Sequence, residues 1–463
     1  MFFCFRAMAA IAAAAGLLLS HATVAKAGSA ADQQPIVVHK NELASARGKD
    51  KSALLLKRAR ERGRVRVIIG LDAAMEFEDD ITPAKQRSQS QALRNAQTAV
   101  AARAGIPAEH VERFETIPFM SGFVTAPQLE RLLRDPKVTS IQEDLPIELQ
   151  LQDSLRVINA KKVWTKEGYV GTGVVIAVLD SGAEYSHPML KGKVVAGLCR
   201  STTSSSEGTK SLCPGGVSAS NDIDSGRNCT KSAVCFHGTH VSSIALGSSA
   251  NLLRGVARGA RLISAQVLSR TSDGRLVGFF SDINSALERV FRLRKTYNIA
   301  SVNVSLGGPL FGSACDESFP ATSAIIGKLF KARIATVIAS GNEGANGTIS
   351  APACIGNAIA VGSTTKDDVI SRFSNHADLV DVMAPGESIK AADLGGGLTL
   401  ASGTSMAAPH VTGTIALLKD ARPDAKVRQL LKALEDGVPV RRKGITKSRI
   451  DSLKAVRLLE GGS

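Results

Sequence analysis

Long apolar runs, aromatic side chains and paired cysteine motifs are all scarce in this sequence of 463 residues. No segment beyond residue 27 reaches about 18 uninterrupted apolar residues, which argues against an enzyme embedded in a membrane. There is no Cys-x-x-Cys pair, so we do not expect a zinc site. Aromatic residues make up 4% of the chain, and none interleaves with the basic residues at 57–62. We therefore expect no nucleic-acid surface in that stretch.

What the chain does contain is enough apolar material, 44% of its residues, for a large core and more than one folded unit. Lys and Arg outnumber Asp and Glu by 57 to 42, a formal charge of +15. Much of this excess lies near the end, where residues 401–463 hold 12 basic and 6 acidic side chains. We expect the charge to favour acidic surfaces or substrates and to aid solubility.

The N-terminus predicts export. Arg6 precedes an apolar run over residues 7–19, and Ala25 and Ala27 supply the small residues of a signal-peptidase site. Residues 1–27 are therefore predicted to be a signal peptide and the protein to be secreted. Removal of the signal takes Cys4 with it and leaves six of seven cysteines, an even number that favours disulfides over free buried thiols.

Residues 28–62 are polar and charged, and we expect a solvated leader or linker there. A compact pattern follows over residues 63–150. A strand at 64–69 leads to a helix that Thr82 and Pro83 open and Gly105 closes. Further strands near 111–114 and 122–125, a helix at 127–134 and a strand at 137–142 complete the order β-α-β-β-α-β. This order predicts a small ferredoxin-like α+β domain, marginally stable alone.

Beyond residue 151 the pattern changes to continuous apolar runs. Residues 173–179 form one such run and end at Asp180, as expected of a strand buried on both faces of a parallel sheet. Similar runs recur at 262–268, 300–306, 334–339 and 358–362, and a helical pattern covers 280–295. The alternation predicts a doubly wound, mostly parallel α/β sheet, whose ligands bind at the carboxyl ends of the strands.

Four segments at strand ends or turns carry unusual polar residues: Val-Leu-Asp-Ser-Gly at 178–182, His-Gly-Thr-His-Val at 237–241, Ala-Ser-Gly-Asn-Glu-Gly at 339–344 and Gly-Thr-Ser-Met-Ala-Ala-Pro at 403–409. Each alone has an ordinary explanation as a helix cap, a helix start or a turn. Together they offer a carboxylate, an imidazole, a carboxamide and a hydroxyl. These are the groups required for acyl transfer through an activated serine.

With these motifs the sequence resembles the subtilisin-like serine proteases, or subtilases, from about Leu155 to Leu434. Residues 302–308 and 382–386 match further stretches of that family, and residues 64–150 resemble its inhibitory propeptide. The resemblance implies a subtilisin-like peptidase domain over 151–463, with a basic C-terminal helical end. The protein is therefore expected to be a secreted serine endopeptidase that acts on polypeptides. It is expected to be made as a self-processing zymogen and to work as a monomer.

The resemblance also assigns roles to individual residues. It makes Asp180 the orienting acid, His237 the general base and Ser405 the nucleophile, while Asn342 donates to the oxyanion. His240 and His410 are expected to be structural. The segment Ser305, Leu306 and Gly307 matches the strand that pairs with an extended substrate. Residues 143–150 are expected to occupy the same groove in the precursor, with self-cleavage near Gln150, so that the propeptide acts as an intramolecular inhibitor.

The sequence departs from the family at its common calcium site. Met189 stands where the family has a carboxylate ligand, and calcium requires six or more oxygens. We therefore expect no metal ligands and no cofactor for the chemistry, while calcium elsewhere stays open. Disulfides are expected instead. We favour Cys315 with Cys354, Cys199 with Cys213 and Cys229 with Cys235, although four cysteines before His237 allow three pairings.

Two other classes of protein share some of these features. A lipase or esterase needs Gly-x-Ser-x-Gly and the order Ser, acid, His, whereas here Ala407 replaces the second glycine and the order is acid, His, Ser. The second alternative is a catalytically inactive subtilase-like protein used for binding or secretion. Loss of a triad residue would favour it. No triad residue is lost, so the peptidase is the preferred hypothesis.

Overall fold

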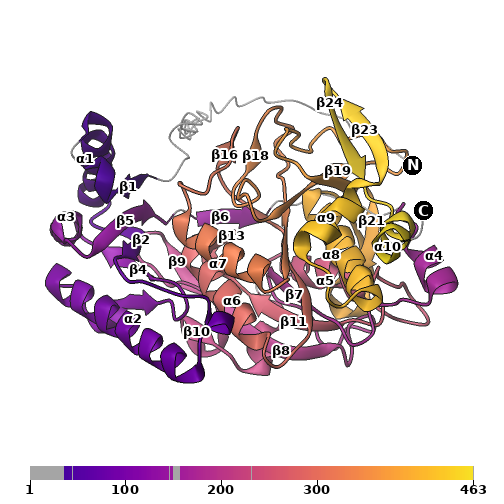
Figure 1. Ribbon diagram of the computed structural model, residues 1–463, viewed down its shortest axis with the longest axis horizontal. Coiled ribbons are helices and arrows are strands. Elements are labelled where there is room, and N and C mark those ends of the chain that lie inside the picture. Colours follow the sequence, from indigo (N-terminus) through magenta and orange to yellow (C-terminus); the bar gives the residue numbers. More distant parts are fainter. Residues whose placement is uncertain (1–35, 44, 145, 150–156, 231, 462–463) are drawn as a thin grey trace, which may run out of the picture.

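The computed structural model describes residues 36–461 except residues 44, 145, 150–156 and 231. A smaller N-terminal unit, indigo to purple in Figure 1, lies beside a larger unit that carries the four motif segments. The predicted signal peptide and the predicted cleavage point near Gln150 lie outside the described residues. Within the described residues, no helix has the length and apolar character needed to cross a membrane.

The N-terminal unit is built on an antiparallel sheet in the order β1-β5-β2-β4-β3, in which β1 spans Val37–His39. Thr82 caps α2 by accepting a hydrogen bond from the Lys85 N–H, and Gly105 ends that helix at a φ of 71°. Glycine suits this position because it has no Cβ to clash. The predicted helix start and end and the predicted order β-α-β-β-α-β are present: β2 (Val65–Leu71), α2 (Pro83–Ala104), β3 (Val111–Arg113), β4 (Phe119–Val124), α3 (Ala126–Arg134) and β5 (Val138–Glu143).

Residues 28–62 were expected to be a solvated linker, but the described part of this segment is folded. Residues 37–39 form β1 at the edge of the sheet, and α1 (Ala46–Glu61) begins at Ser45, whose side chain accepts from the Gly48 N–H at 3.0 Å. Leu55 and Ala59 of α1 are fully buried in the core of the N-terminal unit. Their spacing of four residues gives a narrow apolar stripe on an otherwise charged helix. That composition led to the wrong prediction of a solvated segment.

The larger unit is organised around a ten-stranded sheet in the order β10-β8-β11-β7-β14-β17-β19-β20-β24-β23. Neighbours from β8 to β24 are parallel, and the outermost pairs are antiparallel. This confirms the predicted mostly parallel α/β fold. The strands are β7 (Val175–Asp180), β8 (Val194–Arg200), β10 (Ala219–Ser220), β11 (Arg261–Gln266), β14 (Ile299–Val304), β17 (Ala335–Ala339), β19 (Ile359–Thr364), β20 (Val382–Pro385), β23 (Val438–Arg442) and β24 (Ile445–Arg449).

Helices cover both faces of this sheet. Val175, Ala177 and Leu179 of β7 belong to one hydrophobic core, together with residues of α6 (Phe280–Leu293) and α7 (Pro320–Lys331). Ile176 and Val178 belong to a second core with α5 (His237–Leu246) and α8 (Thr404–Ala421). Successive side chains of a strand point to opposite faces, so β7 is buried on both. This double burial explains the continuous apolar run in the sequence.

A separate sheet in the order β15-β6-β13-β12-β9 joins the two units. Its strand β6 follows directly from the N-terminal unit and pairs antiparallel with β13 on one side and β15 on the other. The sequence did not predict a strand pair at 268–279. The members are β6 (Pro146–Leu149), β9 (Thr209–Ser211), β12 (Leu268–Thr271), β13 (Leu276–Phe279) and β15 (Leu306–Gly307).

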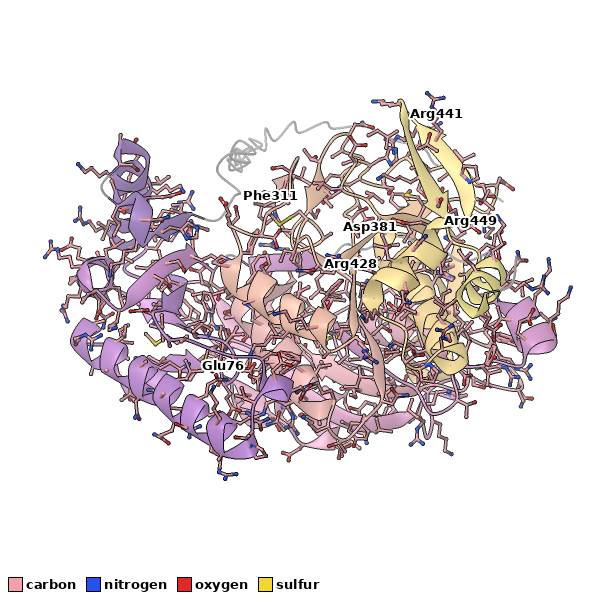
Figure 2. The ribbon with its side chains drawn as sticks, viewed as in Figure 1. Glu76, Phe311, Asp381, Arg428, Arg441 and Arg449 are labelled. Carbon is pink, nitrogen blue, oxygen red and sulfur yellow. A yellow bond between two sulfur atoms is a disulfide. The ribbon has the colours of Figure 1, made fainter. Side chains whose placement is uncertain are left out.

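The C-terminal end is helical only in part. Between α9 and α10 the chain forms the hairpin β23–β24, which extends the large sheet; Figure 2 shows Arg441 near its tip and Arg449 lower on the same hairpin. Arg449 pairs with both carboxylate oxygens of Asp368, at 2.7 and 2.9 Å. The remaining elements are α4 (Ala160–Lys162), β16 (Leu310–Phe311), β18 (Ile349–Ser350), β21 (Ile389–Ala392), β22 (Leu398–Ala401), α9 (Val427–Glu435) and α10 (Ser452–Glu460).

Three disulfides are present, and they are the three favoured from the sequence: Cys199–Cys213, Cys229–Cys235 and Cys315–Cys354. The first joins the end of β8 to the long insertion before α5, and the second lies within that insertion. The third joins the loop before α7 to the segment after β18. Each closes a loop near the carboxyl-end edge of the sheet and so restricts the chain where the motif segments meet.

Candidate active site

The carboxylate and the imidazole of the motif segments are hydrogen-bonded to each other. Asp180 is the last residue of β7 and His237 is the first residue of α5; both are fully buried. His237 Nδ1 lies 2.7 Å from Asp180 Oδ1 and 2.9 Å from Oδ2. Because a carboxylate can only accept, Nδ1 carries the proton and Nε2 presents a lone pair. No described residue forms a hydrogen bond with this buried Nε2.

Local backbone contacts fix this pair. The Ser181 N–H donates to Asp180 Oδ1 at 2.7 Å, and the Gly238 N–H donates to Ser181 Oγ at 2.9 Å. A Cβ on Gly238 would overlap the Gly182 carbonyl oxygen. The start of α5 can therefore approach the end of β7 only because residue 238 is glycine.

Ser405 lies in the first turn of α8, and α8 packs directly against α5. Ser405 Oγ donates to the Ser305 carbonyl oxygen at 3.4 Å, while Ser305 Oγ donates to the Ser405 carbonyl oxygen at 2.9 Å. These reciprocal contacts hold the beginning of α8 at the carboxyl end of β14. The hydroxyl and the His237 imidazole thus sit at the N-termini of two neighbouring helices.

Asn342 follows β17 and is held by the residue that precedes Ser405. Its Oδ1 accepts hydrogen bonds from the Thr404 N–H at 2.8 Å and from Thr404 Oγ1 at 3.0 Å. Thr404 Oγ1 in turn accepts from the Gly341 N–H at 3.2 Å. Since the carbonyl end of the amide is occupied in this way, the NH₂ end is directed away from Thr404.

Ser305, Leu306 and Gly307 lie along an extended slot. Leu306 and Gly307 form β15, whose backbone pairs with Leu149 and Glu148 of β6. On its other side β6 pairs with β13, Glu148 opposite Val277. The slot between β13 and β15 therefore accepts an extended chain through main-chain hydrogen bonds, and Ser305 connects its β15 side to Ser405.

His240, in the second motif segment, and His410, directly after the fourth, are buried and neutral. Burial lowers the pKa of His240 to about 3, with the nearby His237 as a second cause. Burial likewise lowers the pKa of His410 to about 4, and its Nδ1 lies 2.8 Å from the Met406 carbonyl oxygen. Neither is hydrogen-bonded to Asp180 or Ser405 in the described contacts.

One residue of the site was missed from the sequence. Thr404 orients the Asn342 amide, yet in the Gly-Thr-Ser segment it reads as an ordinary residue at a helix start. The sequence contains only one indication of this role, which is that Thr404 directly precedes Ser405.

The described residues contain no cluster of three or more His, Cys, Asp or Glu side chains arranged to hold a metal ion. Met189, which stands where the family has a calcium ligand, is buried.

Comparison with known proteins identifies the family. The Subtilase family (Peptidase_S8) matches residues 171–448. The major intracellular serine protease of Bacillus subtilis (strain 168) is 31% identical over 287 residues, which cover 61% of this chain and 79% of that protein. Subtilisin E of the same organism is 31% identical over 316 residues, 66% of this chain and 72% of that protein.

The fold also matches a solved structure, a protease from Pseudoalteromonas arctica PAMC 21717. The two share a TM-score of 0.54 and 24% sequence identity, over 65% of this chain and 94% of the other. At this identity the match shows a shared fold. The family match extends over more than half of the sequence and includes all four motif segments. The chain therefore belongs to the subtilase family and is a serine endopeptidase.

Proposed function

We propose that this endopeptidase is secreted as a self-processing zymogen, in which Asp180, His237 and Ser405 form the catalytic triad. The observation that carries the proposal is the path of β6. This strand leaves the N-terminal unit and runs between β13 and β15 toward the Ser405 end of the slot, in the manner of an extended peptide.

In the proposed mechanism, His237 Nε2 accepts the Ser405 hydroxyl proton as Oγ attacks the peptide carbonyl carbon. Asp180, at 2.7 Å from Nδ1, keeps the imidazole in the required tautomer and stabilises its charged form. The imidazolium then returns the proton to the departing amine. Water, deprotonated by the same Nε2, hydrolyses the acyl-enzyme and regenerates the serine hydroxyl.

Two donors are proposed for the oxyanion that develops during attack. Asn342 supplies its NH₂ group, which Thr404 orients by occupying Oδ1. The Ser405 backbone N–H supplies the second, at the N-terminus of the 18-residue helix α8. The N-terminal end of a helix dipole favours negative charge there. Both donors are fixed before reaction, so little reorganisation is needed.

Substrate binding is proposed to follow the β6 arrangement. Main-chain hydrogen bonds from β13 and β15 hold an extended polypeptide independently of its side chains. In the precursor β6 occupies this slot, so the N-terminal unit acts as an intramolecular inhibitor until the chain is cut. The bond expected to break is within a few residues of Gln150, outside the described residues.

Contacts between the two units support the propeptide role. Arg66 of β2 donates through Nε to Asp144 Oδ2 at 2.6 Å and to Ser281 Oγ of α6 at 2.7 Å. The Ser281 N–H donates to Asp144 Oδ1 at 3.2 Å, and the Thr116 N–H donates to the Glu288 carboxylate. These contacts hold the N-terminal unit on α6, directly before β6 enters the slot.

Secretion is supported by the three disulfides, which persist in oxidising compartments and are rare in the cytosol. Residues 1–27 would direct the export. One similar protein is named an intracellular protease, so the family alone does not decide the compartment. Expression of the full chain with its signal, followed by detection of the mature protein outside the cell or in the periplasm, tests this part.

Processing is tested by comparing the purified precursor with its Ser405→Ala variant. Mass spectrometry of the unmodified chain should show a new N-terminus near residue 150, and the variant should stay intact. Ser218→Ala, at an exposed position in the insertion before α5 and outside the proposed triad, is the matched control and should be processed normally. Identical processing of the precursor and Ser405→Ala, with no other protease present, contradicts self-processing.

A further inference from the structure

A cavity of about 510 Å³ is lined by residues of the C-terminal half of α5 and of the second turn of α8, and neither His237 nor Ser405 is among its lining residues. Its lining includes Ser243 and Ile244 from the end of α5 and His410 from α8. Residues around α4 and strands β21 and β22 complete it. None of the residues assigned to peptide hydrolysis lines this cavity, and its volume is in the range of small-molecule sites.

The walls of the cavity are mostly apolar. Trp164, Ile244 and Val256 contribute, with Met189 and Leu253. Trp164 Nε1 donates to the Val256 carbonyl oxygen at 2.8 Å, so the polar atom of the indole is already satisfied. The ring itself remains an apolar surface. Such walls favour an alkyl chain over a polar ligand.

The rim carries only positive charge. Lys161, Arg254, Lys366 and Lys390 line the cavity, and all four are exposed. No Asp or Glu is among the lining residues, and none of the four cations forms an ion pair with a described residue. Four like charges around one opening favour an anionic group at that opening.

His410 is the buried polar residue that lines the inner part of the cavity. It is 2% exposed, and its Nδ1 must donate to the Met406 carbonyl oxygen, 2.8 Å away, because that oxygen only accepts. Nε2 is then an acceptor on a neutral ring, since burial lowers the pKa of His410 to about 4. A lone pair does not attract a carboxylate. An anionic head group is therefore favoured at the rim and disfavoured inside.

From this arrangement we propose that the cavity binds one long-chain carboxylate, with the alkyl chain against Trp164, Ile244 and Val256 and the carboxylate among the four rim cations. The apolar walls and the uniformly positive rim together select an anionic amphiphile over a neutral lipid, a cationic amphiphile or a polar peptide. This site is independent of the proposed catalytic triad and of self-processing.

Trp164 makes the proposal directly testable, because it is the only tryptophan of the chain. Laurate is titrated, below its micellar threshold, into the full-length Ser405→Ala variant, which avoids self-digestion. The expected result is a saturable change in tryptophan fluorescence with one laurate bound per chain. Burial of each additional methylene should tighten binding about fourfold from octanoate to laurate.

Substitution of the rim tests the charge assignment. The double variant Arg254→Gln and Lys390→Gln should weaken laurate binding at least tenfold and leave the binding of dodecanol unchanged. Lys432→Gln with Lys454→Gln removes two exposed lysines from α9 and α10, outside the cavity lining, and serves as the matched control. Because all four positions are exposed, both double variants should keep the melting temperature of the parent.

Three outcomes overturn the proposal. One is the absence of a saturable laurate signal, including the case in which another part of the chain already fills the cavity. Another is equal affinity for laurate, dodecanol and dodecyltrimethylammonium, which removes the selection for an anion. The third is an equal loss of laurate binding in the rim variant and in the control variant.

Discussion

At the scale of single residues, the chemistry of Asn342 depends on its neighbour Thr404. An unrestrained carboxamide can present either its oxygen or its NH₂ group to a reacting carbonyl. Here Thr404 occupies Oδ1 through both its N–H and its hydroxyl, at 2.8 and 3.0 Å. In the proposed mechanism only the NH₂ end remains to face the oxyanion, so the orientation of the amide is fixed without substrate.

We predict that Asn342→Ala lowers kcat by about 100- to 1000-fold, a range that is established for the corresponding donor of a subtilisin. A ground-state peptide inhibitor should bind nearly as well as before, because the lost interaction forms mainly in the transition state. Steady-state kinetics and inhibitor titration measure the two effects. Asn346→Ala, an exposed position four residues along the chain, should change neither. Equal losses of turnover and inhibitor affinity would remove Asn342 from the oxyanion role.

Asp180, His237, Asn342 and Ser405 could be proposed as site residues from the sequence because each lies in a short motif with unusual polarity. The structure brings Asp180 to His237, and it links Asn342 to the residue beside Ser405. Thr404 could not be predicted in its orienting role. Its partner lies 62 positions away in the sequence, and such a contact is created only by the packing of α8 on the sheet.

At the scale of elements, the position of α5 depends on a close approach to β7. Gly238 lies against the Gly182 carbonyl and the Asp180 side chain, where a Cβ would overlap the former and lie 3.2 Å from the Asp180 Cβ. A side chain at residue 238 would therefore push the start of α5 away from β7. This movement would lengthen the 2.7 Å contact between His237 and Asp180.

Gly238→Ala is accordingly expected to lower kcat/KM at least 100-fold, because catalytic groups tolerate little displacement. Peptidase assays on a small ester or peptide substrate measure the loss. Gly327→Ala is the matched control, because residue 327 is in the interior of helix α7. The atom nearest to the added Cβ would be 4.0 Å away. That change should keep activity and raise the unfolding free energy by about 0.5–1 kcal/mol. Full activity of Gly238→Ala would contradict the close-approach argument.

Elements were predictable where their pattern is strong and local. The apolar runs of β7, β11, β14, β17 and β19 follow from burial on both sheet faces. The helix α1 was missed because only a narrow stripe, with Leu55 and Ala59, is buried. The pairing of β6 between β13 and β15 depends on partners more than 100 residues away, which periodicity does not report.

At the scale of the whole molecule, a buried charge cluster joins the two units. Arg66 of β2 lies among Asp144, Glu112 and Asp282, with N–O distances of 2.6, 3.1 and 3.9 Å. Thr202 also donates to Asp282. One guanidinium faces three carboxyl groups, of which Asp144 holds it most closely. Burial raises the pKa of Asp282 to about 8 despite the attraction of Arg66, and the negative Glu112 and Asp144 add to the rise.

Glu288 adds a second buried carboxyl group at the same boundary. It accepts from the Thr116 N–H of the N-terminal unit, and Lys328 and Glu112 are the charged groups that influence it. Burial raises its pKa to about 7, while Thr116 and Lys328 partly oppose the rise. Neither Asp282 nor Glu288 stood out in the sequence, because an acidic residue on an amphipathic helix predicts a solvent-facing position.

The two raised pKa values give the contact between the units a defined pH dependence. In water a carboxyl group ionises near pH 4, so burial in the assembled molecule favours the protonated form of Asp282 and Glu288. The stabilisation that these two protonated groups give to the contact between the units is fully present below about pH 4. It is lost as pH rises through about 7 and 8. The N-terminal unit should therefore be held more weakly at pH 8.5 than at pH 5, by up to about tenfold per pH unit for each proton released.

Hydrogen exchange of the Ser405→Ala precursor measures this dependence, with each rate divided by its intrinsic value at the same pH. Protection of β2 and β5 should fall from pH 5 to pH 8.5, because a unit of this size is marginally stable without its partner. Asp282→Asn, which stays neutral at every pH, should flatten the profile and raise protection at pH 8.5. Asp273→Asn, in an exposed loop of the larger unit, should leave the slope unchanged. A pH-independent profile, or an equal effect of both variants, would show that the strength of the contact does not depend on the protonation of Asp282.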